Sequence, residues 1–388
     1  MISDALLRLV RCPDCLGTLS DDADALTCTT CGRRCARGPG YLDLRPSATF
    51  TERTKYLDEA LHADARHETV SPALLQAGVR QWMLRRLLRP ARGDTIVDLG
   101  CGSGRSLVWN HASGATIVGI DVAPYFAQEA LERGELVLGD LRRLPFADGA
   151  FNKGYALDVF EHLSREALDG VLAEIARVMR PGGQVFVYSH VRKNSWLAGG
   201  LKAVNALARR LERLGLVDLR QERLRKSDHL NPLSDIPDLE RVVGLAGFRI
   251  ARIRYYTPLI GAFVENILMR MAERAVGRRE GREGASLRSA EGSTPGGVEE
   301  GALRAGGSAP GGAEEGALRA GEQAAREARL ARTAAKKRLA AKGPLFYALK
   351  GVTAMMTLDV WVFGRVRTGP FFVLLERAPT ASRGQGGP

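Results

Sequence analysis

The sequence predicts an α/β protein whose main domain is a doubly wound, largely parallel sheet. Between Thr95 and about Thr257, short apolar runs alternate with segments of helical periodicity, the pattern of a parallel sheet with crossover helices. Two cysteine pairs precede these runs, and a glycine-rich turn follows the first of them. The 388 residues are 45% hydrophobic and 26% charged, which is enough for a large core in two or three domains.

The N-terminal segment carries four of the six cysteines, as Cys12/Cys15 and Cys28/Cys31 with a gap of 12 residues between the pairs. Four thiolates at this spacing suit tetrahedral Zn²⁺, and four protein ligands would leave the ion no open position. We therefore expect residues 1–45 to form a small zinc ribbon in which the metal is structural.

Seven strands are expected after the ribbon. Six follow one another as TIVDLG, TIVGID, LVLGD, FNKGYAL, GQVFVYS and FRIARIRYY, and the seventh, GPFFVLLE, starts at Gly369. The sheet domain is therefore assigned to residues 46–257 and 369–378. Residues 192–228 would form a basic, amphipathic cap. Residues 258–368 would form a second insertion, with apolar helices and a nearly duplicated, Gly-rich linker at about 277–322 that is expected to be disordered.

The formal net charge of +12 is concentrated rather than spread. Residues 192–226 hold ten basic and three acidic side chains, and residues 322–342 hold seven and two, so these segments carry the whole excess. Such patches point to local anionic partners. The start, MISDALLRLVRCPDC, lacks the long apolar run of a signal peptide, and the cysteine spacing indicates metal ligation rather than disulfides. A cytoplasmic location is expected.

The glycine-rich turn, Gly100-Cys101-Gly102-Ser103-Gly104, joins the first strand to a helix. Glycines let the backbone turn sharply and approach a ligand at a helix N-terminus, although nicotinamide sites use similar turns. Acidic residues stand at three successive strand ends: Asp98, Asp121 and Asp140. Asp121 is placed to accept hydrogen bonds from ribose hydroxyls, and Asp140 from an adenine amino group.

The ordered series VDLGCGSG, GIDVAP, GDLRRLPFADGAF, ALDVFEHL and IARVMRPGGQVFVYS resembles the class I S-adenosylmethionine-dependent methyltransferases, specifically the type 11 group, over about residues 70–257 and the final strand. The resemblance implies a Rossmann-like, seven-stranded sheet with an antiparallel last strand, and S-adenosyl-L-methionine as cofactor. It places Gly100, Gly102 and Gly104 at the methionine moiety, with Asp98 just before them. It also places Asp121 at the ribose, Asp140 at the adenine and Leu141 near the adenine ring.

Candidate residues for the acceptor side follow the later strands: Asp158 after the fourth, His190 after the fifth, and His229 before the next helix. Asp158-x-x-Glu161-His162 is similar to the acidic-acidic-His cluster of ubiquinone-pathway O-methyltransferases, which can hold a divalent ion. The plainer interpretation, that Glu161 and His162 pin the following helix, is favoured. His190 and His229 are expected either to line the acceptor pocket or to be hydrogen-bonded structural histidines.

The predicted function is methyl transfer to an oxygen or carbon of a small-molecule or lipid-like acceptor, because no N/D-P-P-Y/F motif for nitrogen follows the fourth strand. Residues 257–271 and 326–366 combine apolar helices with flanking Lys and Arg, which favours peripheral contact with the inner face of a membrane. The apolar run from Val352 to Phe363 is expected to be too short to span it. Alternatively, 257–271 and 344–363 pack together as a hairpin.

Two rival functions remain open. The ribbon resembles Trm112-like modules and the ribbon of 23S rRNA guanine methyltransferases, so an rRNA guanine methyltransferase with an RNA-contacting ribbon is the first. Only 6% of the residues are aromatic, which argues against a stacking platform for single-stranded RNA. The second rival is a scaffold that keeps the cofactor fold without turnover.

Overall fold

The computed structural model describes residues 2–22, 25–47, 70–191, 199–214, 229–256, 259–268, 271 and 342–379. The expected linker at 277–322 and the basic segment 326–341 lie outside the described residues. The same holds for 192–198 and 215–228 of the expected cap.

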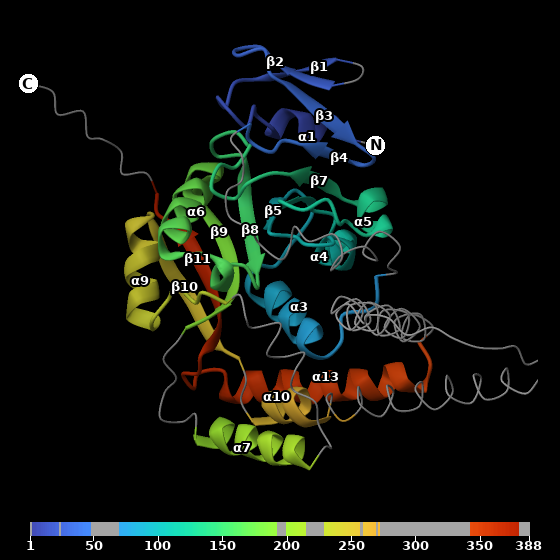
Figure 1. Ribbon diagram of the computed structural model, residues 1–388, viewed down its shortest axis with the longest axis vertical. Helices are drawn as coiled ribbons and strands as arrows, with labels where there is room; N and C mark the ends of the chain where they lie inside the picture. The colour runs from blue at the N-terminus through green and yellow to red at the C-terminus, as the bar shows by residue number, and fades with distance from the viewer. Residues whose placement is uncertain are drawn as a thin grey trace, which may run out of the picture.

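The described strands form one eleven-stranded sheet in the order β1-β2-β3-β4-β7-β6-β5-β8-β9-β11-β10 (Figure 1). The N-terminal strands are β1 Leu19–Asp22, β2 Ala25–Cys28, β3 Arg34–Gly38 and β4 Tyr41–Asp43. The others are β5 Thr95–Leu99, β6 Thr116–Asp121, β7 Glu135–Leu138, β8 Phe151–Leu157, β9 Met179–His190, β10 Phe248–Tyr255 and β11 Pro370–Arg377. All seven strands expected after the ribbon are therefore present.

The seven strands have the Rossmann-like arrangement that was predicted. Strands β7, β6, β5, β8 and β9 are parallel, and β11 runs antiparallel to both β9 and β10. The interiors of β5, β6, β7 and β11 are buried on both faces, which explains why these strands read as nearly continuous apolar runs. The carboxyl ends of the parallel strands share one edge, so residues that end β5, β6 and β7 are brought together there.

Helices cover both faces of this sheet. On one face lie α3 Leu75–Leu87, α4 Arg105–Asn110 and α5 Gln128–Arg133, and on the other α6 Arg165–Val178 and α9 Ile236–Leu245. Local caps explain where the last two begin. The Ser164 side chain accepts a hydrogen bond from the Ala167 N–H, and Asp235 accepts one from the Asp238 N–H.

The N-terminal strands continue the main sheet. After α1 (Asp4–Leu9) and the antiparallel strands β1–β3, β4 pairs in parallel with β7, with Leu42 opposite Val137 and Asp43 opposite Leu138. The Leu44 N–H also donates to the Leu138 carbonyl at 2.8 Å. Strand β4 therefore covers the edge of β7 and brings the cysteine-containing segment next to the ends of β6 and β7.

Three helices lie together at the end of the molecule opposite the N-terminal strands: α7 Gly199–Arg213, α10 Leu259–Phe263 and α13 Pro344–Phe363 (Figure 1). Asp359 of α13 is buried and accepts hydrogen bonds from the N–H groups of Ile260 (3.1 Å) and Gly261 (3.4 Å). The two apolar segments thus do contact each other, as the hairpin alternative predicted, although much of α13 stays exposed.

The helix that contains the apolar run Val352–Phe363 is longer than the run itself and has the bounds that the hairpin alternative gave it. Helix α13 has 20 residues and begins at Pro344, eight residues before the apolar run, because Pro344 suits a first helical turn and the following residues continue the helix. Among the described residues, α13 is the one helix long and apolar enough to cross a membrane by length and composition.

Candidate active site

The glycine loop between β5 and α4 has its three glycines in the left-handed region, with φ of 70° at Gly100, 54° at Gly102 and 78° at Gly104. A Cβ at Gly104 would lie 2.6 Å from the Ala130 Cβ, so this glycine allows α4 to pack on α5. A Cβ at Gly102 would have no described atom within 4 Å. Gly102 is therefore the point of the loop where a ligand can approach the backbone.

Asp121 ends β6 beside this loop. Its Oδ2 accepts a 2.8 Å hydrogen bond from the Gly102 N–H, and its Oδ1 accepts one of 3.1 Å from the Ala123 N–H. Asp140, after β7, is held differently, because the Arg142 guanidinium contacts both carboxylate oxygens at 2.8–3.1 Å. The structure thus brings the two predicted acids to one edge of the sheet. An adenine amino group at Asp140 would share the carboxylate with Arg142.

Asp98, the third predicted acid, is 2% exposed beneath the loop. Its Oδ2 has no hydrogen bond of good geometry from the described residues, and burial raises the pKa of this carboxyl well above its ordinary value although the neighbouring Tyr155 hydroxyl lowers it. A buried carboxylate oxygen without a donor is costly. A cationic ligand group such as the α-ammonium of S-adenosylmethionine would compensate it, so the donor set fits this cofactor.

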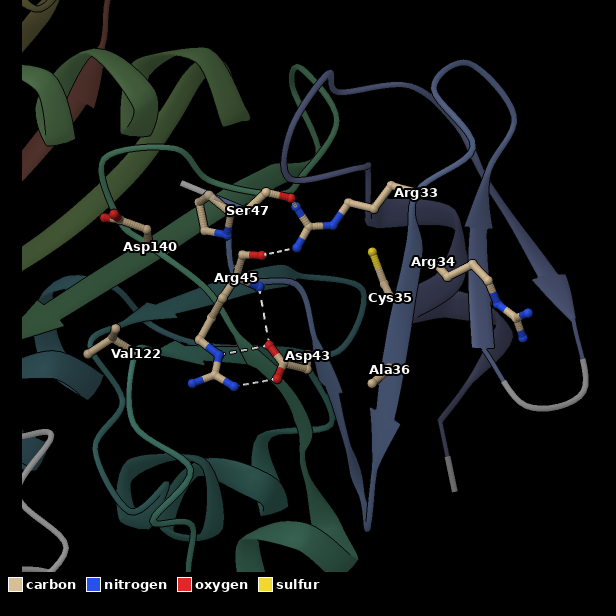
Figure 2. A pocket seen from close by; sticks show the side chains of 10 residues that line it. Arg33, Arg34, Cys35, Ala36, Asp43, Arg45, Ser47, Val122 and Asp140 are labelled. Carbon is tan, nitrogen blue, oxygen red and sulfur yellow. Dashed lines mark hydrogen bonds and ion pairs between the residues drawn. The ribbon is translucent and has the colours of Figure 1, made fainter. Parts of the chain in front are cut away.

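A cavity of about 430 Å³ lies between the N-terminal strands and the ends of β6 and β7. Figure 2 shows Val122 and Asp140 on one side, Cys35 and Ala36 of β3 on the other, and the Asp43–Arg45 ion pair between them. Arg33, Arg34, Pro46 and Ser47 complete the lining. These contributions from the N-terminal segment were not predicted from the sequence, because they depend on the pairing of β4 with β7.

Asp158 directly follows β8 and has a left-handed backbone conformation, with φ of 57°. Its carboxylate forms an ion pair with Arg80 of α3, and the Arg80 guanidinium lies 5.0 Å above the centre of the Tyr188 ring. Neither Arg80 nor Tyr188 was among the predicted site residues. Arg80 lies within helix α3, whose sequence carries no signal for such a role.

Glu161 is the centre of a polar cluster at the ends of β8 and β9. It is 1% exposed, its Oε2 accepts a 2.8 Å hydrogen bond from the Ser189 hydroxyl, and its Oε1 lies 3.4 Å from the His190 Nδ1. The rings of His162 and His229 pack edge to face at 4.7 Å. Burial tends to raise the pKa of Glu161, but the adjacent His190 lowers it overall.

The Asp158-x-x-Glu161-His162 motif does not assemble as a unit. Potential ligand atoms of Glu161, His162 and His229 all lie within 4.8 Å of one another, whereas Asp158 is held by Arg80 and is not in that group. Asp158 therefore has a different partner from the three clustered side chains, and the metal-binding alternative for Asp158-x-x-Glu161-His162 stays a prediction. His190 and His229 do lie on the acceptor side, with ring centres 6.0 Å apart.

The four predicted cysteine ligands converge at the other end of the sheet. Their sulfurs are 3.7 Å apart for Cys12 and Cys31, and 3.5 Å apart for Cys15 with Cys28 and with Cys31. A tetrahedral ion with Zn–S bonds of about 2.3 Å needs sulfurs slightly less than about 4 Å apart. The thiol cluster therefore fits Zn²⁺.

In comparisons with known proteins, this chain is similar to methyltransferases. Residues 97–187 match the family model of a methyltransferase domain. The chain is 32% identical over 144 residues to sterol 24-C-methyltransferase of Pneumocystis carinii, covering 34% of each chain. It is 31% identical over 134 residues to probable tRNA methyltransferase 9B of Mus musculus, covering 34% of this chain and 30% of that one. The chain spans about a third of the length of these curated relatives.

Among solved structures, a Haemonchus contortus phosphoethanolamine N-methyltransferase in complex with S-adenosyl-L-methionine aligns with 84% of this chain and 61% of its own. The sequence identity is 14% and the TM-score 0.43. The two curated relatives act on chemically different acceptors by their names, a sterol and a tRNA.

Proposed function

We propose that this protein transfers a methyl group from S-adenosyl-L-methionine to a lipid-like acceptor at a membrane surface. The match of residues 97–187 to a methyltransferase domain supports the methyl transfer, and the Rossmann-like sheet agrees with it. One observation carries the proposed methyl transfer: the Gly102 N–H donates a hydrogen bond to the Asp121 carboxylate at a point of the loop where no described atom crowds the backbone. A ligand that approaches the backbone at Gly102 would therefore also lie next to the Asp121 carboxylate.

Each predicted cofactor residue has a role in this proposal. Gly102 would face the methionine moiety, Asp98 would compensate its ammonium charge, Asp121 would accept hydrogen bonds from the ribose, and Asp140 from the adenine. Leu141, which packs partly buried against the core, would border the adenine ring. When bound, S-adenosylmethionine supplies an electrophilic methyl group on a sulfonium.

Methyl transfer is an in-line displacement, in which the acceptor atom bonds to the methyl carbon as the carbon–sulfur bond breaks and sulfur keeps the electron pair. Rate enhancement then comes mainly from alignment and exclusion of water. Asp158, His190 and His229 are the predicted polar groups on the acceptor side. Asp158 is fixed by Arg80, so it would orient an acceptor without first losing rotational freedom of its own.

The lipid-like acceptor is supported by the exposed face of α13. Along this helix Tyr347, Gly351, Ala354, Leu358 and Trp361 recur at helical spacing and are all exposed, with Trp361 63% and Tyr347 62% accessible. On α10 and the turn that follows it, Ile260, Phe263, Leu268 and Met271 are exposed as well. Apolar patches of this kind mark interaction sites, and Trp and Tyr suit the membrane–water interface.

The opposite face of α13 belongs to the folded domain, which favours a helix lying on the membrane over one that crosses it. The Leu75 N–H donates to the Thr353 hydroxyl at 2.7 Å, and Asp359 receives its hydrogen bonds from α10. A spanning helix would break both contacts and carry Asp359 into the bilayer, at a cost of several kcal/mol, about 3 on insertion scales.

Basic residues around the exposed helices indicate that the proposed membrane surface is anionic. Lys342, Lys350, Arg365 and Arg367 are exposed within or beside α13, and Arg209, Arg210 and Arg213 are exposed on α7. Each Lys or Arg close to an anionic leaflet contributes about 1 kcal/mol of attraction. The proposed partner is therefore the anionic, inner face of a membrane, and RNA is the competing anionic partner.

The test is methyl transfer from radiolabelled S-adenosylmethionine to total lipid and to total RNA from the same cells. Label in the lipid fraction supports the proposal, whereas label in RNA alone would move the function to the rRNA or tRNA class. Cofactor binding without transfer to either fraction or to soluble metabolites would favour the scaffold. For the thiol cluster, we propose a structural Zn²⁺ that holds the N-terminal strands together.

A further inference from the structure

We propose that Glu161, His162 and His229 bind one divalent metal ion of the zinc type on the acceptor side of the sheet. The three residues come from two places in the chain, the turn after β8 and the segment before α9. Their ligand atoms nevertheless all lie within 4.8 Å of one another. Ligand atoms bound to one ion at about 2.0–2.2 Å stand about 3.3–3.6 Å apart in a tetrahedral site, so the three side chains would close on the ion by small rotations.

The state of Glu161 is an independent reason to expect a cation. This carboxylate is 1% exposed, and its Oε1 accepts no hydrogen bond from the described residues, its neighbour being the His190 Nδ1 at 3.4 Å. A buried carboxylate with one oxygen unsatisfied is strongly disfavoured. A metal ion at Oε1 would add a close ligand contact to the long contact with His190.

Hydrogen bonds from neighbouring residues fix the positions of the proposed ligands, as is usual around metal sites. The Ser189 hydroxyl binds Oε2 of Glu161 at 2.8 Å and so leaves Oε1 as the coordinating atom. The segment that carries His229 is tied to the same turn, because the Asn231 N–H donates to the Glu161 carbonyl at 3.0 Å. The relative position of Glu161 and His229 is thus fixed by the backbone.

The donor set selects the class of metal and leaves room for a ligand. Two imidazoles and one carboxylate suit Zn²⁺ and similar divalent transition metals, whereas Mg²⁺ and Ca²⁺ prefer oxygen alone. Three protein ligands leave an open coordination position, unlike the four thiolates of the N-terminal cluster. If the proposed methyl transfer holds, this position would take an acceptor hydroxyl or enol oxygen and promote loss of its proton.

The test is the zinc content of the full-length chain after equilibrium dialysis against buffered Zn²⁺. The wild type is expected to hold one zinc ion more per chain than either His229→Gln or His162→Gln. The matched control is His111→Gln, a histidine of an exposed turn away from the cluster, which should keep the wild-type content. All variants retain the four cysteines, so the zinc of the thiol cluster is common to every measurement.

Equal zinc content in the wild type and in His229→Gln would overturn the proposal. Circular dichroism and S-adenosylmethionine binding, measured on the same samples, show whether a variant has lost its fold, and His229→Gln lies in a surface segment where unfolding is not expected. If the extra zinc is present but no methyl acceptor is found, the metal site stands and the proposed function fails separately.

Discussion

The backbone N–H of Gly102 donates a 2.8 Å hydrogen bond to Oδ2 of Asp121, which joins the glycine loop after β5 directly to the end of β6. The Ala123 N–H binds the other oxygen at 3.1 Å, so two backbone donors fix the orientation of one carboxylate. Hydrogen bonds from backbone groups to an ionised carboxylate are among the stronger ones. The orientation of the Asp121 carboxylate is therefore fixed relative to the glycine loop.

Replacing Asp121 with Asn is expected to weaken S-adenosylmethionine binding about 10- to 100-fold, because hydrogen bonds to a charged group contribute about 1.5–3 kcal/mol. Isothermal titration calorimetry gives the affinity. Asp148→Asn, which changes a largely exposed acid far from the loop, should bind like the wild type. Equal affinities of the wild type and Asp121→Asn would contradict the assigned ribose contact.

Gly104→Ala is expected to lower the free energy of unfolding by about 1–3 kcal/mol, because alanine is strained at a positive φ and its Cβ would meet Ala130. Gly170→Ala is the matched control. Gly170 lies within α6, and a Cβ there would have no described atom within 4 Å, so this change should stabilise slightly. Urea denaturation measures both, and a Gly104→Ala variant as stable as wild type would refute the packing argument.

The ion pair between Arg165 and Asp238 is expected to make stability depend on pH in the acid range. Burial alone would raise the pKa of Asp238, but the Arg165 guanidinium and the Ser234 N–H lower it to about 2. The carboxylate thus contributes stability above its unfolded pKa of about 4. That contribution is lost as the pH falls from about 4 toward 2.

Asp238→Asn should therefore unfold about 1 kcal/mol more easily than wild type at neutral pH, and this difference should vanish near pH 2. Urea denaturation at several pH values is the measurement. Glu240→Gln, a change on the exposed side of the same helix, serves as the control. A difference that stays constant from neutral pH to pH 2 would show that the ion pair is not its source.

The double variant Leu358→Ser with Trp361→Ser is expected to reduce binding to phosphatidylcholine vesicles that contain phosphatidylglycerol, because it removes two exposed apolar side chains of α13. Sedimentation with vesicles measures the bound fraction. Leu245→Ser is the control, since Leu245 is 80% exposed but lies on α9, away from α13. Failure of the wild type to sediment with these vesicles would remove the membrane from the proposed function.

The strands and the cofactor loop could be predicted because their signals are local. An apolar run such as TIVDL and the glycines after it carry the information for β5 and its turn within a few residues. The contact between Arg80 and Asp158 could not be predicted, because it joins residues far apart in the chain through an unremarkable position of α3. His229 could be flagged as a candidate, but its approach to His162 depends on how the segment before α9 folds back.

Strand β4 ties the N-terminal segment to the Rossmann-like sheet, so the two cannot be separated without exposing part of the sheet. Its pairing with β7 satisfies backbone groups that would otherwise form an open sheet edge next to the ends of β6 and β7. Exposed edges of this kind recruit other chains and promote aggregation. A shortened protein that starts at residue 70 would keep all seven strands of the Rossmann-like sheet and yet present an unprotected edge. The N-terminal segment therefore secures solubility as well as one wall of the cavity beside Asp140.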